Sequence, residues 1–265
     1  MEKIRAVFEK TGITEVGAVS FESVFPLLEC RAKSRLPENA KTVIVALFPY
    51  YIGEFEKRNF SRYAIVTDYH NVAGEKLRKI CEELSKKYPF SFVPFVDNSP
   101  VREVDAAVRA GLGMLGENSL LINPEYGSYV FIGTIVTDME LDFKEYPVTK
   151  CIGCGECKKA CPSGCITDGK VDKTRCLSDI TQKKGELTEE EISLVEKGKS
   201  LWGCDICQEV CPMQTNKKTP IKEFYTDNKA FLELSDLTKE AIKDKAYSFR
   251  GEKPLVRNYE LIYKK

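Results

Sequence analysis

The chain has 265 residues, of which 40 are basic and 40 acidic, so its formal net charge is zero. This balance excludes a general electrostatic attraction to nucleic acid, and any such binding would need a local basic patch. The length allows one main body that carries a small second module.

Residues 1–16 predict an amphipathic helix and lack the apolar run and small-residue cleavage site of a signal peptide. No stretch approaches the roughly 20 apolar residues that are needed to span a bilayer. We therefore expect a cytoplasmic protein without a membrane partner, in which a reducing compartment keeps the cysteines available for metal.

Strand and helix patterns alternate over the first half of the sequence. A helical spacing of apolar residues predicts a helix over 68–88, and residues 101–113 predict a helix that is closed by a glycine. Short apolar segments rich in β-branched or aromatic residues predict strands at 42–51, 90–96 and 128–136. The alternation predicts an α/β (α+β) body over residues 1–145.

Residues 146–220 are dense in Cys, Gly and Pro and show little periodicity. We expect bound metal, more than an apolar core, to hold this module together. Within it, 186–199 predicts a charged surface helix that connects two groups of cysteines. Residues 221–265 predict a C-terminal extension of short helical pieces.

The cysteines form two runs with metal-ligand spacing. The first, Cys-x2-Cys-x2-Cys-x3-Cys-Pro from Cys151 to Pro162, has the spacing of bacterial two-cluster ferredoxins, in which the fourth cysteine ligates the other cluster. The second, Cys-x2-Cys-x3-Cys-Pro, extends from Cys204 to Pro212. Two interlocked runs predict two [4Fe–4S] clusters and electron transfer, and they disfavour zinc, which also binds CxxC pairs.

The interlocked spacing divides these cysteines between the two clusters. The ligands of one cluster would be Cys151, Cys154, Cys157 and Cys211. The other would take Cys161, Cys204 and Cys207, and it needs a fourth ligand. The candidates are Cys165, in a turn where a small buried residue would serve equally well, and Cys176, on the segment between the runs. We prefer Cys176.

Two other features have ordinary structural explanations. Cys30 and Cys81 lie in helical patterns, where a cysteine is usually a small core residue. Gly111, Gly113 and Gly116 have the spacing of a dinucleotide-binding fingerprint, but they close a predicted helix, whereas the fingerprint opens one. We therefore do not expect a dinucleotide cofactor.

The sequence resembles the epoxyqueuosine reductase family, whose cobalamin and iron–sulfur enzymes complete the queuosine modification of tRNA and are related to reductive dehalogenases. The segments that carry the resemblance are SRLPENAKTVIVALFPYY (34–51), SRYAIVTDYH (61–70), FVDNSPVREVDAAVRAGLGMLGENSLLINPEYGSYVFIGTIVTD (95–138), RCLSDITQKKG (175–185) and LWGCDICQEVCP (201–212). Cys176 stands where the family has its lone cluster cysteine. The resemblance is to a short form, without the C-terminal helical-repeat domain of the family.

The resemblance implies base-off cobalamin between the α/β body and the ferredoxin-like module. The corrin contacts that it implies are those of Ser61, Asp97, Leu121, Ile132 and Ser178. It also implies that Asp97 donates a proton, and burial against an apolar corrin face would raise the pKa of this carboxyl toward neutral pH.

The resemblance also implies that other residues of the matching segments line the active site or contact the tRNA. Tyr69 and His70 of the DYH motif are expected to line the site, and His70 is the single histidine of the sequence. Lys183, Lys184 and Gly185 match a loop that contacts tRNA.

The activity implied by the resemblance is the reduction of epoxyqueuosine to queuosine in tRNA. Its electrons would come from an external donor of the ferredoxin or flavodoxin type. One alternative is a paralogous, reductive-dehalogenase-like reductase of a small molecule, and another is a ferredoxin-like electron-transfer protein without catalysis. Cobalamin bands in an absorption spectrum would argue against the pure electron carrier.

Overall fold

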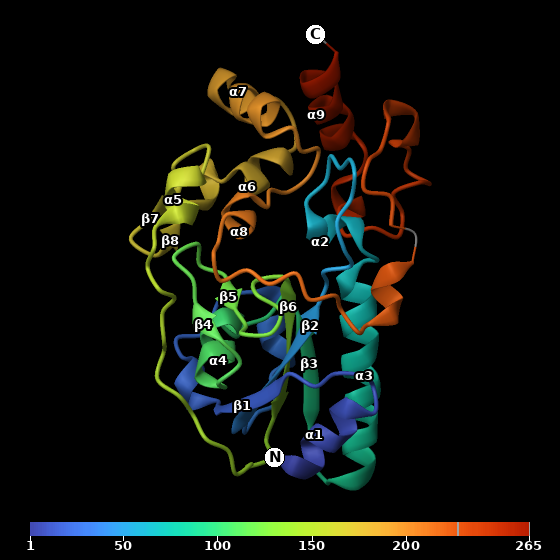
Figure 1. Cartoon of the computed structure of the whole chain (residues 1–265). Coiled ribbons are helices and arrows are strands. Elements are labelled where there is room, and N and C mark those ends of the chain that lie inside the picture. Colours follow the sequence, from blue (N-terminus) through green and yellow to red (C-terminus); the bar gives the residue numbers. More distant parts are fainter. Residues whose placement is uncertain (227, 265) are drawn as a thin grey trace.

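The body of the protein is built on an antiparallel sheet. A computed structural model describes residues 1–226 and 228–264, and these place four strands in the spatial order β1, β2, β6, β3 (Figure 1). The strands are β1 (Val16–Ser20), β2 (Thr42–Pro49), β3 (Phe92–Val96) and β6 (Val130–Thr137). The strands predicted at 42–51, 90–96 and 128–136 are confirmed, whereas β1 is not among the predicted elements.

Helices cover both faces of this sheet. Helices α1 (Glu2–Glu9) and α3 (Tyr69–Lys87) lie on one face and α4 (Glu103–Arg109) lies on the other (Figure 1). Side chains of a strand point alternately to the two faces, so Ile44 packs with α1 and α3 while Val45 packs with α4. The body is therefore a three-layer α/β structure, and the helices predicted over 68–88 and 101–113 are confirmed.

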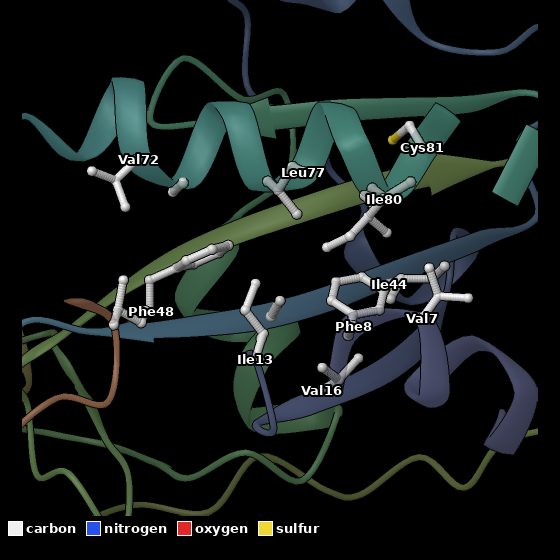
Figure 2. Close-up of a cluster of buried hydrophobic side chains, with 14 of the residues drawn as sticks. Val7, Phe8, Ile13, Val16, Ile44, Phe48, Val72, Leu77, Ile80 and Cys81 are labelled. Carbon is white, nitrogen blue, oxygen red and sulfur yellow. The ribbon is translucent and has the colours of Figure 1, made fainter. Parts of the chain in front are cut away.

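Helix α3 presents one apolar stripe to the sheet. Val72, Leu77, Ile80 and Cys81 lie on this stripe and face β2 and α1, as Figure 2 shows. Asp68 caps the start of the helix, since its side chain accepts a hydrogen bond from the backbone N–H of His70. Cys81 is a buried core residue, as expected.

The local structure of Cys30 differs from the one predicted from the sequence. It lies in extended backbone just before the 3-10 helix η2 (Arg31–Arg35), and it is half-buried beside the α4-side core. The prediction that Cys30 lies within a helix is wrong, because the apolar residues before it belong to an irregular segment. A preceding 3-10 helix, η1 (Glu22–Val24), interrupts this segment.

The cysteine-rich module is made of short elements around a small apolar cluster of Leu177, Ile180, Leu194 and Val195. Its helices are α5 (Glu156–Ala160), α6 (Leu177–Thr181), α7 (Glu189–Gly198), α8 (Ile206–Glu209) and the 3-10 helix η3 (Lys173–Arg175). Its strands are β7 (Ile166–Thr167) and β8 (Lys170–Val171), and β4 (Met114–Leu115) and β5 (Leu121–Ile122) form a second small hairpin in the body. Helix α7 confirms the charged helix expected over 186–199.

The C-terminal extension packs against the body and the module together. Its elements are η4 (Lys222–Tyr225), η5 (Leu234–Asp236), η6 (Ser248–Arg250) and α9 (Lys253–Tyr263), and the body contributes α2 (Arg62–Ile65) to the same cluster. The buried Asn258 of α9 donates hydrogen bonds of 2.8 Å to the carbonyls of Thr181 and Leu201. None of the described helices has the length and apolar character needed to cross a membrane.

Close packing of α4 on the sheet requires a glycine in β1. A Cβ atom at Gly17 would lie 2.5 Å from the carbonyl oxygen of Ala110 at the end of α4. We expect Gly17→Ala to lower the free energy of unfolding by about 1–3 kcal/mol, because backbone must move to admit the methyl group.

Gly74 provides the matched control. It lies within α3, where an added Cβ would meet no atom closer than 3.8 Å, so Gly74→Ala should stabilise the protein by about 0.5–1 kcal/mol. Urea unfolding of the two variants beside the parent measures both effects. Equal midpoints for the two variants would contradict the close contact between β1 and α4.

Candidate active site and cysteine centres

The first cysteine group comes together from the two runs. Its four members line one pocket with Asn118 and Ile152: Cys151, Cys154, Cys157 and Cys211. Helices α5 and α8 pack side by side, and this contact brings the last cysteine of the second run to the first run. Cys154 is exposed and the neighbouring Ile152 is 66% exposed, so this group lies at the surface.

The second group forms around Cys204 and Cys207. Burial raises the pKa of the Cys204 thiol to about 12, with smaller contributions in the same direction from the nearby Cys176 and Cys161. Burial likewise raises the pKa of Cys207 to about 12, and Cys204 and Cys176 add to that rise. Thiols in such surroundings become thiolates when a metal centre supplies positive charge. The donor set therefore fits an iron–sulfur cluster.

Cys165 is a close neighbour of this group. It is buried, as expected for the turn that contains it, and its Sγ lies 3.4 Å from the Sγ of Cys161. Cys176 adds to the raised pKa of both Cys204 and Cys207, so it lies near both thiols. This proximity supports Cys176 as the fourth ligand, which stays a prediction.

Asn118 is a residue of the cysteine centres that sequence reasoning missed. It is buried, lines the pocket of the first group, and lies close enough to Cys207 of the second group to oppose the rise in the pKa of that thiol. An amide N–H donor between the two groups would stabilise negative charge on the sulfur atoms. The sequence signal was weak, since an asparagine beside a serine and close to a glycine is also typical of a turn.

Asp97, Tyr69 and His70 come together at the end of β3 and the start of α3. His70 Nδ1 lies 2.8 Å from Asp68 Oδ1, and His70 Nε2 lies 3.4 Å from Asp97 Oδ2. These hydrogen bonds raise the pKa of His70 to about 9, first through Asp68 and then through Asp97. His70 is therefore an imidazolium near neutral pH.

The pKa of Asp97 lies below its ordinary value, chiefly because His70 hydrogen-bonds its carboxylate. The rise in this pKa that burial against a corrin face would cause stays a prediction, and the lowering by His70 is a second influence that the sequence pattern does not reveal. Asp97 also has a φ of 61°, a left-handed backbone that a residue other than glycine adopts only at a cost. The proton of the His70–Asp97 pair therefore resides on His70, and Asp97 is its ionised partner.

The pair opens onto a cavity of about 200 Å³. The residues that line it are Tyr63, Tyr69, Asp97, Glu103, Val130, Phe131 and Ile132. Burial raises the pKa of Tyr63 and of Tyr69 far above the ordinary value, so both phenols keep their protons. Tyr69 stacks on Phe131 with ring centroids 4.2 Å apart. One wall is therefore apolar and the other carries acids and O–H donors.

The second cysteine run is tied to this cavity. The backbone N–H of Ser61 donates to the Trp202 carbonyl at 2.9 Å, and the Trp202 indole N–H donates to the Tyr63 hydroxyl at 2.8 Å. The N–H of Arg62 donates to the buried Asp205 carboxylate at 2.8 Å. The segment 61–63 thus borders the cavity through Tyr63 and contacts Trp202 and Asp205, which flank Cys204.

The other residues implied as corrin contacts occupy different places. Ile132 lines the cavity, and Ser61 is buried just before α2, where it approaches Gly203 closely. Leu121 is buried in the α4-side core, and the half-buried Ser178 is the second residue of α6. The corrin contacts of all these residues stay predictions.

The loop expected to contact tRNA is held by the C-terminal helix. Arg257 of α9 donates hydrogen bonds to the carbonyls of Lys183 at 2.8 Å and Gly185 at 2.7 Å. Lys183 forms an ion pair with Glu191, while Lys184 is exposed. The loop is ordered by these contacts, and it presents one lysine to solvent.

Two parts of the chain match described families. Residues 150–214 match the family described as 4Fe-4S double cluster binding domain, and residues 31–98 match the one described as Epoxyqueuosine reductase QueG, DUF1730. The first match covers both cysteine runs, and the second ends one residue beyond Asp97.

Curated relatives named epoxyqueuosine reductase align over much of the chain. The one from Lactococcus garvieae is 37% identical over 244 residues, which are 83% of this chain and 68% of the relative. The one from Cyclobacterium marinum is 37% identical over 78% of this chain and 67% of the relative. For the Escherichia coli relative the identity is 35%, and the match spans 64% of this chain but only 45% of the relative.

Solved structures extend the likeness to the fold. Epoxyqueuosine reductase from Streptococcus thermophilus has a TM-score of 0.83 and 26% identity, over 98% of this chain and 80% of that one. A crystal structure of epoxyqueuosine reductase with an epoxyqueuosine-modified tRNA-Tyr stem loop has a TM-score of 0.82 and 28% identity over the same shares. A catabolic reductive dehalogenase, 17% identical with a TM-score of 0.53 over 97% of this chain and 35% of that one, shares the fold alone.

Sequence identity and structure thus lead to the same group of proteins. The aligned part reaches 68% of the Lactococcus garvieae relative at 37% identity, and the fold matches over 98% of the chain. The chain belongs to the epoxyqueuosine reductase family.

Proposed function

We propose that this protein reduces the epoxide of epoxyqueuosine in tRNA to the alkene of queuosine, using two [4Fe–4S] clusters and base-off cobalamin. The observation that carries the proposal is the cavity at the His70–Asp97 pair, which the segment around Tyr63 connects to the second cysteine group. The proposal assigns residues 1–145 to the catalytic body, 146–220 to the cluster module and 221–265 to a helical extension.

The clusters would be held by two interlocked sets of thiolates. One set is Cys151, Cys154, Cys157 and Cys211, and the other is Cys161, Cys176, Cys204 and Cys207. Such clusters supply one-electron transfer. The exposed Cys154 and Ile152 place the first set where an external donor of the ferredoxin or flavodoxin type could reach it. The second set lies on the far side of the Tyr63 segment that lines the cavity.

Cobalamin would rest on the body at this cavity, on the side that faces the module. Val130, Phe131 and Ile132 give the cavity an apolar wall on which a flat ring can rest, and the bound cofactor supplies the metal centre that passes electrons to the substrate. Both ring nitrogens of His70 face carboxylates. The single histidine is thus not free to ligate cobalt, which supports the base-off state.

The residues of the cavity would position the epoxide and supply a proton. His70 holds a proton at neutral pH, and Asp97 lies between this imidazolium and the cavity. Transfer of the proton through Asp97 would protonate the epoxide oxygen as its bond to carbon breaks. Tyr63 and Tyr69 remain protonated, so their hydroxyls can donate hydrogen bonds to the substrate.

The RNA would bind at the module. Lys184 is exposed on the loop that Arg257 holds in place, and a lysine there can contact phosphate. The family relative solved with a modified stem loop supports tRNA as the substrate. Since tRNA is a cytoplasmic substrate in bacteria, we propose that the protein acts in the cytoplasm.

The choice of the eighth ligand is tested by two cysteine variants. The parent, prepared without oxygen, should carry about eight irons per chain, as two [4Fe–4S] clusters require. Cys176→Ala should lose one cluster, whereas Cys165→Ala should keep both because Cys165 only packs beside Cys161. Iron and sulfide analysis measures this difference. Equal loss in the two variants would contradict the assignment of Cys176.

The role of Asp97 is tested by Asp97→Asn, which keeps the size of the side chain. We expect the parent, loaded with cobalamin and clusters, to convert epoxyqueuosine in tRNA to queuosine, and the variant to turn over about 10²–10⁴-fold more slowly because a positioned acid is lost. Mass spectrometry of digested tRNA measures the conversion, and bound iron and cobalamin are the controls. An inactive parent contradicts the proposed function, and an unchanged variant contradicts the role of Asp97.

The imidazolium of His70 predicts a limit at high pH. Its pKa of about 9 means that the site loses its proton as the pH rises through that value, so turnover should fall there. Asp68→Asn keeps a helix-capping side chain but replaces the carboxylate whose hydrogen bond with His70 contributes most to this pKa, and the limit should therefore move to lower pH. Rate profiles of the two proteins measure the shift. An identical limit in both would exclude His70 as the titrating group.

A further inference from the structure

Glu103 lies on the wall of the same cavity. Its position at the start of a helix suggests only a favourable interaction with the helix dipole, but the fold gives it a different environment. It is the first residue of α4 and lines the cavity together with Asp97. Its Oε1 is shielded from solvent, and among the described residues it has no hydrogen-bond partner. A buried carboxyl oxygen without a partner is costly unless the group is neutral or meets a ligand.

Two physical effects compete for the protonation of this carboxyl. The start of a helix favours a negative charge by about 0.3–1 kcal/mol at exposed positions. Burial acts against the charge and raises the pKa of Glu103 well above its ordinary value, and the charge of Asp97 adds to the rise. The short α4 offers little dipole to offset burial, so burial and the charge of Asp97 both favour the protonated form of Glu103.

Groups from the other elements around the cavity do not reverse this state. Asp97, at the end of β3, contributes negative charge, and the neutral phenols of Tyr69 and Tyr63 come from α3 and α2. Strand β6 contributes the apolar side chains of 130–132. The imidazolium of His70 is in contact with Asp97, and Asp97 in turn lines the cavity with Glu103.

The chemistry of the proposed function needs two protons, and this inference rests on that function. When an epoxide becomes an alkene, both C–O bonds break and a C=C bond forms. The two electrons would be supplied by the external donor, with the clusters and the cobalamin as carriers, and the oxygen would leave as water after accepting two protons. The His70–Asp97 pair holds one transferable proton, so a second acid must face the same oxygen.

We propose that Glu103 is the second proton donor of the cavity and protonates the departing oxygen that the His70–Asp97 pair has protonated once. Its unpartnered Oε1 is then the atom kept free for substrate. After turnover the carboxylate regains its proton from solvent, because part of the Glu103 side chain remains accessible.

Infrared difference spectroscopy of Glu103→Gln tests the protonation without any turnover. The spectrum of the cofactor-loaded parent at neutral pH, minus that of Glu103→Gln, should show the C=O stretch of a protonated carboxylic acid. The same difference taken with Asp97→Asn should lack this band, because Asp97 is ionised. Absence of the band from the Glu103 difference would overturn the proposal.

Turnover of epoxyqueuosine tRNA tests the role. Glu103→Gln should keep its iron and cobalamin and lose about 10²–10⁴-fold in rate, while Glu103→Asp should recover part of the loss because it restores an acid. Asp105→Asn is the matched control, since Asp105 lies in the same helix and pairs with Arg109 outside the cavity; it should keep the parent rate.

The outcomes separate this inference from the function on which it rests. A parent that reduces the epoxide while Glu103→Gln keeps the parent rate overturns the role of Glu103 alone. A parent that does not reduce the epoxide overturns the proposed function and the proton-donor role with it. If Glu103→Gln fails to retain cofactors, Glu103→Asp decides: no recovery of rate in a variant with full iron and cobalamin overturns the role.

Discussion

The buried carboxylate of Asp205 fixes the position of the second cysteine run relative to the body. Its Oδ2 accepts hydrogen bonds from the Arg58 guanidinium at 2.7 Å and from the Arg62 N–H at 2.8 Å, and the residue is only 3% exposed. Breaking a buried ion pair by removing one partner costs about 3–5 kcal/mol. Because Asp205 follows Cys204 directly, this contact determines where the buried thiolates lie relative to Tyr63 and the cavity.

Local pattern was sufficient for the central elements of the body. The fully buried β2 and the apolar stripe of α3 both appear in the sequence, because their burial is regular along the chain. The edge strand β1 was not predicted, since VGAVS is short and follows a helical pattern without a break. The order β1, β2, β6, β3 could not be predicted either, because it joins segments that are far apart in the sequence.

In the candidate site, too, some features could be predicted from local sequence and others depend on residues that only the fold brings together. The cysteine spacing alone was enough to predict that Cys211 joins the first cysteine group. A cluster needs four ligands, and the first run directs its fourth cysteine to the other cluster. Glu103 was missed because an acidic residue at the start of a helix has an ordinary explanation, and only the folded chain reveals what buries it. The lowered pKa of Asp97 likewise depends on His70, which lies 27 positions away.

At Asp97 the requirements of stability and of activity conflict, because its backbone has the left-handed conformation. A residue other than glycine in this conformation stores about 1–3 kcal/mol of strain, and glycine would release it. Glycine would also remove the carboxylate and loosen the loop between β3 and α4. Selection for a more stable fold and selection for a faster enzyme would therefore favour different residues here, and an aspartate at this position indicates that the carboxylate outweighs the strain.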